Sequence, residues 1–379
     1  MVSVSLPDSL TTIKNSAFKW CNKITDVYYA GTIAQWEAIE VSANNTELLN
    51  ATLHTQEVAP TDPIKLVGTN IELGSSLTIN FNGLKAVLDQ YEDVYVIFEA
   101  EGRDPVKVSE YFTTTDSQGR IRYNFAYEGV SILDLNVPVL ATVYGTFNDV
   151  EYSYTAAKAV SVLSYCNTKI ASGETDSETA GVCANLLKYA MAAEAYMAAE
   201  YGTSTAGHLV NVRSAQELAT IDTYATPDEA VNVEKTSSNT VGTRVKFAGQ
   251  SLEMVSRITL RYRIAILDEI LDTSKLTFKV TYTDYNGNAA YQDYTFDDLE
   301  YDAKTDSYIL GFSGFNATQM RDMAKCTIYI DGVEHCYYAN SVENYCRTAL
   351  NSSTQPEVVK YLAKRISLYG DACYDAYGK

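Results

Sequence analysis

Two kinds of hydrophobic pattern divide the chain. Residues 4–27 carry apolar side chains at short, uneven spacings, whereas apolar and polar residues alternate from residue 64 onward. Alternation is typical of strands with one buried face. Near residues 182–196 and 362–373 the apolar spacing changes to four and three, which predicts amphipathic helices. We therefore expect a small N-terminal unit and then strand-rich regions that end in helices.

The predicted helices each carry one apolar stripe. The stripes consist of Val182, Leu186, Tyr189, Ala193 and Tyr196 in the first helix, and of Leu362, Ile366, Tyr369 and Cys373 in the second. A shorter helix should precede the first one and form a helical hairpin with it on the sheet; its apolar side would hold Ala159, Val162, Cys166 and Ile170.

Capping residues support the predicted helix ends. Thr175 and Glu178 have the spacing of a capping box at the start of the first helix, and Gly202 lies beyond its end. Pro356 lies near the first turn of the second helix, and Gly378 lies beyond its end.

The strand-rich region repeats itself along the chain. Residues 64–81 align without gaps on residues 245–262, at an offset of 181 positions, and nearly every apolar position stays apolar. A second match has an offset of 180 and joins Ser161, Val162, Tyr165, Cys166 and Tyr189 to Ser341, Val342, Tyr345, Cys346 and Tyr369. Strands are predicted at 94–98 and 140–144 in the first copy, and at 276–280 and 327–330 in the second. The expected fold is α+β, with two tandem β-sandwich-like domains that each end in a helical hairpin.

The N-terminal phrase LPDSLTTIKNSAFKWCNKITDVYYAG closely resembles the BspA-type leucine-rich repeats of bacterial surface proteins. The segments TIAQWEAIEV and NNTELLNATLH resemble the closing segment of such proteins. This resemblance covers about the first 57 residues, and it implies one terminal leucine-rich-repeat coil with a cap. The cap residues would be Trp36, Ile39, Leu48, Leu49 and Leu53. The phrase NLLKYAMAAEAYM is similar to a segment that follows such repeats in surface proteins of Gram-positive anaerobes.

These patterns divide the chain into residues 1–57, residues 58–205 and residues 206–379. The connector, residues 203–240, contains the phrases HLVNV and AVNVE, which could add strands to either domain. The N-terminus lacks the basic region and apolar core of a signal peptide. We expect a fragment of a longer secreted protein, from which the signal peptide and the surface anchor are missing.

Composition narrows the choice of partners. The net charge of −19 would repel a phosphate backbone and an anionic lipid surface, which disfavours nucleic acid and direct membrane insertion. Tyrosine is abundant, with 30 residues, and it suits both strands and exposed recognition surfaces.

The cysteines do not suggest a zinc site or a disulfide framework. There are 7, with no C-x-x-C motif, so we expect free and mostly buried thiols. A two-residue turn at Asp331-Gly332 would place Cys326 opposite Tyr337 and Cys336 opposite Thr327. The two thiols should therefore miss each other by one position.

No residue has the context of a catalytic, cofactor-binding or metal-binding group. His54, His208 and His335 are isolated and are interpreted as surface or edge-strand residues. The acidic stretch 293–302 contains Asp293, Asp297, Asp298, Glu300 and Asp302. We favour the interpretation that these residues form a solvent-exposed acidic edge and loop. The alternatives are a pair of glycosidase carboxylates and a calcium site. The segment 285–288 is predicted to be a hairpin turn.

The resemblance implies a non-enzymatic cell-surface protein that binds host or community ligands, either proteins such as immunoglobulin and matrix proteins or mucosal glycans. Two linked copies would gain avidity. The alternatives are a carbohydrate-binding or carbohydrate-active protein and a structural stalk. If the two copies share a fold but expose different residues in one groove, that groove is where a ligand should be sought.

Overall fold

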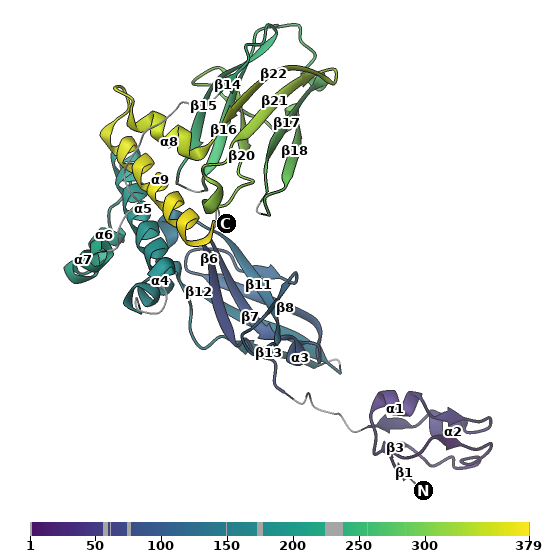
Figure 1. The fold of residues 1–379 in the computed structure, drawn as a ribbon. Helices are drawn as coiled ribbons and strands as arrows, with labels where there is room; N and C mark the ends of the chain where they lie inside the picture. Colours follow the sequence, from purple (N-terminus) through teal and green to yellow (C-terminus); the bar gives the residue numbers. More distant parts are fainter. Residues whose placement is uncertain are drawn as a thin grey trace.

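A computed structural model describes residues 2–55, 60, 62–73, 77–148, 150–172, 177–223, 238–255, 257–284 and 286–378. The fold is α+β (Figure 1). A small N-terminal unit contains parallel strands. Two larger units follow, and each has antiparallel sheets and a pair of helices.

Parallel strands organise the N-terminal unit. One sheet has the order β1-β3-β5 and a second has the order β2-β4. The bounds are β1 (Ser3–Leu6), β2 (Thr12–Ile13), β3 (Asp26–Tyr29), β4 (Glu40–Val41), β5 (Thr52–His54), α1 (Ile33–Glu37) and α2 (Thr46–Leu49). In the larger sheet, Asp26 pairs with Ser3 on one side and with Thr52 on the other.

The N-terminal unit has a core of its own, formed by Ile13, Ile24, Val27, Tyr29, Ile39 and Leu48. Of the predicted cap residues, Ile39 and Leu48 are buried, and Trp36 and Leu53 are partly buried against this core. The prediction for Leu49 is wrong, because its side chain is 56% exposed. Leu48 and Leu49 are neighbours in the single turn of α2, so only one of them can face the core.

The first of the two larger units contains two four-stranded antiparallel sheets, with the orders β10-β11-β7-β6 and β13-β12-β8-β9. Their strands are β6 (Gly68–Leu73), β7 (Leu77–Leu84), β8 (Glu92–Ala100), β9 (Val106–Val108), β10 (Phe112–Thr115), β11 (Ile121–Val130), β12 (Val139–Phe147) and β13 (Val150–Thr155). The ring of Phe98 on β8 lies 5.6 Å from Phe81 on β7 and 5.6 Å from Tyr127 on β11. The two sheets therefore face each other across an apolar core. The short α3 (Lys85–Leu88) follows β7, and the 3-10 helix η1 (Ile132–Asp134) follows β11.

The second unit repeats this arrangement, with the sheet orders β15-β16-β20-β19 and β14-β22-β21-β17-β18. Its strands are β14 (Ser238–Asn239), β15 (Val245–Glu253), β16 (Thr259–Ile266), β17 (Leu276–Thr283), β18 (Ala289–Thr295), β19 (Glu300–Asp302), β20 (Ser307–Phe312), β21 (Ala324–Ile330) and β22 (Val333–Asn340). Its 3-10 helices are η2 (Thr273–Lys275), η3 (Phe296–Asp298) and η4 (Ala317–Gln319). The strands predicted at 94–98, 140–144, 276–280 and 327–330 lie in β8, β12, β17 and β21, which confirms them.

The first hairpin of each unit has the same register. Ile71 pairs with Ile79 in the first unit, and Leu252 pairs with Leu260 in the second. Each residue of the second pair lies 181 positions after its counterpart, as in the sequence alignment. Because a slip of one residue would turn every side chain to the opposite face, the shared register gives both hairpins the same buried side.

The predicted helical hairpins are present in both units. They are formed by α4 (Val162–Ala171) with α5 (Ser177–Tyr201) and by α8 (Val342–Leu350) with α9 (Glu357–Tyr377). The predicted stripe residues of α5 and α9 are buried except for Tyr196, which is partly buried. Ala159 is exposed and precedes α4, so its placement on the helix was wrong. The helix begins after Ser161, whose hydroxyl oxygen caps it by accepting a hydrogen bond from the main-chain N–H of Ser164.

The ends of the long helices follow the predicted caps in three of four cases. Gly202 has φ +61°, and its N–H donates to the Ala198 carbonyl, which ends α5. Pro356 is the N-cap of α9, and Gly378 is its C-cap. Thr175, the predicted cap of α5, lies outside the described residues.

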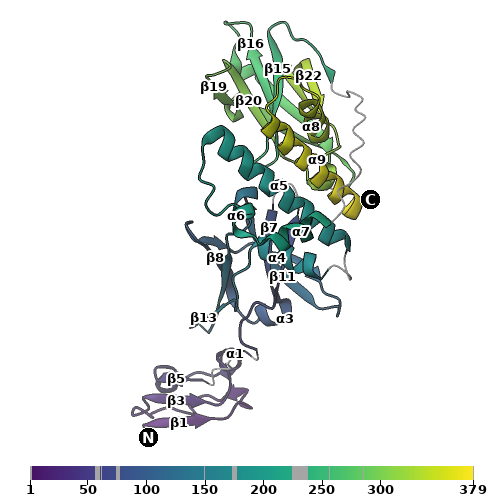
Figure 2. The same cartoon turned by 90° about the vertical axis from the view of Figure 1, so that its left-hand side faces the viewer.

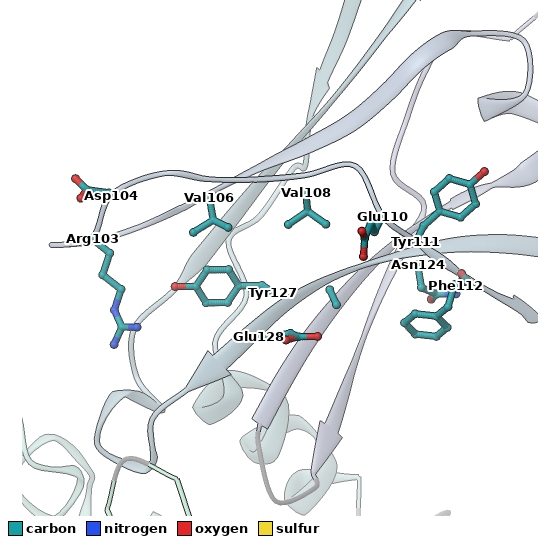
Figure 3. A pocket seen from close by; sticks show the side chains of 11 residues that line it. Arg103, Asp104, Val106, Val108, Glu110, Tyr111, Phe112, Asn124, Tyr127 and Glu128 are labelled. Atoms are coloured by element: carbon teal, nitrogen blue, oxygen red, sulfur yellow. Dashed lines mark hydrogen bonds between the residues drawn. The ribbon is translucent and has the colours of Figure 1, made fainter. Parts of the chain in front are cut away.

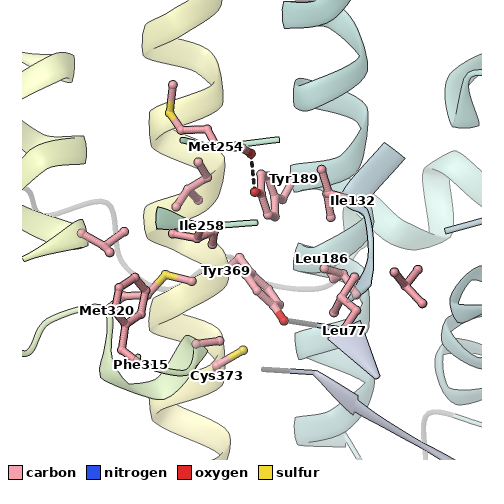
Figure 4. Packing of buried hydrophobic residues seen from close by; sticks show 14 of the residues in the cluster. Leu77, Ile132, Leu186, Tyr189, Met254, Ile258, Phe315, Met320, Tyr369 and Cys373 are labelled. Atoms are coloured by element: carbon pink, nitrogen blue, oxygen red, sulfur yellow. Dashed lines mark hydrogen bonds between the residues drawn. The ribbon is translucent and has the colours of Figure 1, made fainter. Parts of the chain in front are cut away.

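Helices α5 and α9 join the two units by packing against each other in opposite directions. The Thr179 hydroxyl is 2.7 Å from the Tyr377 hydroxyl, and the rings of Tyr189 and Tyr369 are 5.9 Å apart. Tyr189 and Tyr369 are equivalent in the sequence repeat, so the same position of each unit meets its own counterpart. Figure 2 places these helices between the two groups of sheets, and Figure 4 shows both tyrosines in the shared core.

Hydrogen bonds also cross between the units. The Tyr189 hydroxyl donates to the Met254 carbonyl at the end of β15, as Figure 4 shows. The Ser131 hydroxyl donates to the Val255 carbonyl at 3.3 Å. One hydrophobic cluster extends through the sheets and helices of both units. The two units therefore share a core, whereas the N-terminal unit does not contribute to it.

The connector differs from its prediction. The phrase HLVNV is helical rather than a strand, because Leu209–Val212 form α6. Leu209 is buried, and its N–H donates to both carboxylate oxygens of Glu194 on α5, at 2.8 and 2.9 Å. The next helix, α7 (Ala215–Thr223), also packs on α5. The phrase AVNVE lies outside the described residues.

Both predicted hairpin turns are confirmed, but the strand pairing predicted after the Asp331-Gly332 turn is not. Asp284 accepts hydrogen bonds from main-chain N–H groups in the turn between β17 and β18. Asp331 and Gly332 join β21 to β22 with φ values of +50° and +76°. A β-bulge at His335 then shifts the register, so Cys326 pairs with Tyr338 and Cys336 with Ile328. The prediction of Tyr337 and Thr327 as their partners was wrong, because it assumed a regular ladder.

All 7 cysteines are free thiols, and every one except Cys21 is buried. Burial raises the pKa of Cys373 to about 12 and that of Cys336 to about 11. These thiols are therefore protonated at neutral pH, and a buried protonated thiol is a poor nucleophile and a poor metal ligand.

Candidate ligand-binding groove

The three histidines lie in separate parts of the fold. His54 is on the edge strand β5, where its Nε2 is 2.9 Å from the Asp26 carboxylate and its ring stacks on Tyr28. This hydrogen bond lowers the pKa of Asp26. His208 precedes α6, and His335 lies at the bulge of β22.

The acidic stretch 293–302 forms parts of two edge strands and the turn between them. Asp298 accepts hydrogen bonds from Thr295 and caps η3, and Asp302 stabilises the turn that follows β19. Glu300 pairs with Arg261 at 2.8 Å. Within the described residues, no group of three or more His, Cys, Asp and Glu side chains could hold a metal ion. The hydrogen bonds of Asp298 and Asp302 are local, and they stabilise the turns next to the edge strands.

A groove of about 660 Å³ opens on the first unit. Figure 3 shows two facing segments, with Arg103 and Tyr127 at one end and Tyr111 and Phe112 at the other. One wall comes from the β9 region and the start of β10, and the other comes from β11. The lining residues are Arg103, Asp104, Val106, Val108, Glu110, Tyr111, Phe112, Asn124, Ala126, Tyr127 and Glu128.

The groove exists because the edge strands on this side are short. β9 pairs with β8 only from Val106 to Val108. β10 pairs with β11 only from Ile121 to Asn124, although β11 continues to Val130. Among the described strands, none therefore covers this side of β11 beyond Asn124.

Aromatic side chains form one end of the groove. Tyr111 and Phe112 are 47% and 41% exposed. The Tyr111 ring stacks on Tyr123 with centroids 4.0 Å apart, which fixes its orientation. Asn124, which pairs with Phe112, is buried, and its amide donates to the Thr114 hydroxyl at 2.9 Å.

Charged side chains lie along the length of the groove (Figure 3). Arg103 donates to the Asp134 carboxylate. Partial burial works to lower the pKa of Arg103, but Asp134 and the Tyr127 hydroxyl outweigh it and raise the pKa, so the guanidinium stays charged. Three exposed carboxylates, of Asp104, Glu110 and Glu128, also line the groove. Because Arg103 is already paired with Asp134, these carboxylates give the groove a negative character.

The corresponding edge of the second unit is built differently. Tyr123 pairs with Gly83, and its counterpart Tyr308 pairs with Ile264, which lies 181 positions after Gly83. Phe296 packs 4.7 Å from the Tyr308 ring. Leu299 also packs against the core there. The buried position of Asn124 is taken by Ile309, so the two units share strands but differ at this edge.

A second, smaller depression of about 430 Å³ lies on the second unit across β17, β18 and β21. Lys279 lies 3.6 Å from the Asp293 carboxylate, and its ammonium is 4.4 Å from the centre of the exposed Tyr291 ring. The charges here are therefore balanced by neighbouring side chains, unlike the carboxylates of the larger groove.

The groove was not predicted from the sequence. One wall comes from residues 103–112 and the other from residues 124–128, and no local motif joins the two segments. The signal that could have found the groove is the contrast between the copies at these positions.

None of the described helices is long and apolar enough to cross a membrane. The chain matches no protein-family model, and no curated protein is significantly similar to it.

Proposed function

We propose that the chain is a non-enzymatic recognition module of a bacterial cell-surface protein, and that it binds a host or microbial surface ligand through the groove of the first unit. The groove carries this proposal, because it is a place where the two units share a strand order, apart from the additional β14, and yet expose different residues. A local difference at an edge of a common framework is expected when a scaffold is kept and a binding function is added.

The proposal includes a finer description of the architecture. We interpret each larger unit as a β-sandwich with a helical hairpin, and the pair as a tandem duplication within residues 58–205 and 206–379. Antiparallel sandwiches of this kind are frequent in cell-surface proteins, which supports the location by analogy. We interpret residues 1–57 as the last leucine-rich-repeat coil and its cap. The strands that begin at Ser3, Asp26 and Thr52 have spacings in the range of such repeats.

The shared core supports a rigid binding surface. Because α5 and α9 pack together and hydrogen bonds cross between the units, the groove is presented on a fixed framework. A preorganised site avoids the entropy cost of ordering loops when a ligand binds. The exposed rings of Tyr111 and Phe112 suit recognition, since they offer contact area with little rotamer freedom to lose.

The test is a binding survey with the whole chain and one groove variant. Immobilised mucin, matrix proteins, immunoglobulins and glycans are probed with the wild type and with Tyr111→Ala. We expect binding to at least one of these ligands and at least a tenfold weaker affinity for the variant. The matched control is Tyr301→Ala, because Tyr301 is an exposed tyrosine that packs on Tyr308 at the corresponding edge. Absence of binding to all ligands would contradict the proposal.

A second candidate is a carbohydrate-binding or carbohydrate-active protein. The observation in its favour is that exposed Tyr111 and Phe112 share the groove with carboxylates of Glu110 and Glu128. Aromatic rings and carboxylates are the side chains that sugar-binding clefts use. Binding restricted to glycans, or release of sugars from them, would favour this candidate. A structural stalk would bind none of the ligands.

A further inference from the structure

We propose that the groove binds an extended polypeptide segment with basic side chains, which adds as a strand beside β11. This inference rests on the proposed recognition function and specifies its ligand class. It combines three observations: an uncovered strand edge, an excess of exposed carboxylates, and polar side chains whose hydrogen bonds are already made within the protein.

The uncovered edge favours an extended main chain as the ligand. The paired part of β10 ends opposite Asn124, whereas the groove continues along Ala126, Tyr127 and Glu128. The unpaired edge of a strand presents main-chain N–H and C=O groups that an added strand can pair with. From Phe125 to Glu128 this edge is about 13 Å long, which accommodates about four residues of a ligand strand.

The charge of the groove favours basic side chains on that ligand. Asp104, Glu110 and Glu128 are exposed, and the nearby cation of Arg103 is neutralised by Asp134. The same charges disfavour a second copy of this chain as the occupant, because the net charge of −19 would repel it. An apolar residue at alternate ligand positions could contact Val106 and Val108 on the opposite wall.

The polar side chains favour a peptide over a sugar. Sugar hydroxyl groups are usually bound by side-chain donors together with carboxylate or amide acceptors. The Asn124 amide already donates to Thr114, and one face of the Tyr111 ring is covered by Tyr123. The hydrogen-bonding capacity that remains in the groove is that of carboxylates and of the main chain.

The experiment titrates the whole chain with capped hexapeptides of alternating lysine and valine. Three further probes are the glutamate–valine counterpart, the lysine–valine peptide with alternate main-chain nitrogens methylated, and a set of neutral oligosaccharides. Calorimetry gives the affinities, and amide hydrogen exchange reports the strand edge. We expect the lysine–valine peptide to bind at least tenfold more tightly than each of the other probes. We also expect it to slow exchange at those amides of residues 125–128 that do not already bond to β7.

Two charge variants locate the site. Glu110→Lys with Glu128→Lys should weaken binding of the lysine–valine peptide at least tenfold. The control makes two equal charge changes at exposed positions of the second unit, Glu269→Lys with Glu334→Lys. The affinity for the lysine–valine peptide should then stay within twofold of the wild-type value. Equal binding of the methylated peptide, unchanged exchange at 125–128, or a preference for the oligosaccharides would overturn the inference. If the ligand survey still gives binding that Tyr111→Ala weakens, the recognition function stands and only the peptide assignment fails.

Discussion

Tyr189 and Tyr369 occupy equivalent positions in the two units, but their hydroxyl groups have different partners. Tyr189 donates to the Met254 carbonyl of the other unit, whereas the buried Tyr369 hydroxyl lies near the Cys373 thiol of its own helix and makes no hydrogen bond of ordinary geometry within the described residues. Burial raises the pKa of both phenols, so both hydroxyls keep their protons. The sequence predicted both side chains as buried, but not their partners, because Met254 is distant in sequence from α5.

We expect Tyr189→Phe to lower the free energy of unfolding by about 1–2 kcal/mol, because it leaves the buried Met254 carbonyl without its donor. Tyr369→Phe is the matched control, and it should cost less than about 1 kcal/mol because a thiol is a weak partner. Urea unfolding followed by circular dichroism measures both values. Equal losses would contradict the assigned hydrogen bond.

Asp116 should make stability depend on pH. The main-chain N–H of Arg120 and the guanidinium groups of Arg120 and Arg122 lower the pKa of Asp116 far below its ordinary value. A carboxylate with a lowered pKa stabilises the fold above its unfolded pKa, and this contribution is lost as the pH falls. We expect Asp116→Asn to be less stable than the wild type at pH 7, with a difference that shrinks below about pH 4.

Urea titrations at pH 7, 4 and 3 measure this dependence. Asp297→Asn is the control, because Asp297 is an exposed aspartate with no ion pair among the described residues. A difference between the wild type and Asp116→Asn that stays constant with pH would rule out the assigned role of the carboxylate.

At the scale of elements, the sequence predicted most regular structure and missed its irregularities. The long helices and four strands were found because their hydrophobic periods extend over many residues. HLVNV was too short for its pattern to distinguish a helix from a strand, and the contact of Leu209 with Glu194 decided the outcome. The bulge at His335 also has no sequence signature. The pairing of β21 with β22 after the Asp331-Gly332 turn could therefore not be predicted from the sequence.

Two helical glycines should respond in opposite ways to substitution by alanine. A Cβ at Gly370 in α9 would lie 2.6 Å from the Met320 sulfur, whereas a Cβ at Gly181 in α5 would meet nothing within 4 Å. We expect Gly370→Ala to destabilise the protein by about 1–3 kcal/mol through overpacking. Gly181→Ala should stabilise it by about 0.5–1 kcal/mol through helix propensity. Chemical denaturation of both variants tests this, and a stabilising Gly370→Ala would contradict the packing of α9 on η4.

At the scale of the whole molecule, the candidate site was the hardest feature to predict. The sequence repeat predicted two related units, and the matching strand orders agree with it. The groove needs residues 103–112 and 124–128 to face each other across two sheets, and only the tertiary fold brings them together. Its openness also depends on how short β9 and β10 are, and strand ends are weakly encoded in a hydrophobic pattern.

The separate cores predict two unfolding transitions. Both tryptophans of the chain, Trp20 and Trp36, belong to the N-terminal unit, so tryptophan fluorescence reports that unit alone. Circular dichroism is dominated by the two larger units. We expect the two signals to change at different urea concentrations, and Tyr189→Phe to shift only the second. Coincident transitions in the wild type would show that the N-terminal unit is energetically coupled to the rest.

The contact between Tyr189 and Tyr369 has a consequence for any protein built from more of these units. When two copies contact each other through the same surface, that surface is occupied in both copies. No equivalent surface is then left to bind a third copy. Proteins that contain more of these units should therefore carry them in even numbers. An unpaired unit would expose an apolar helix to solvent and would be prone to aggregate.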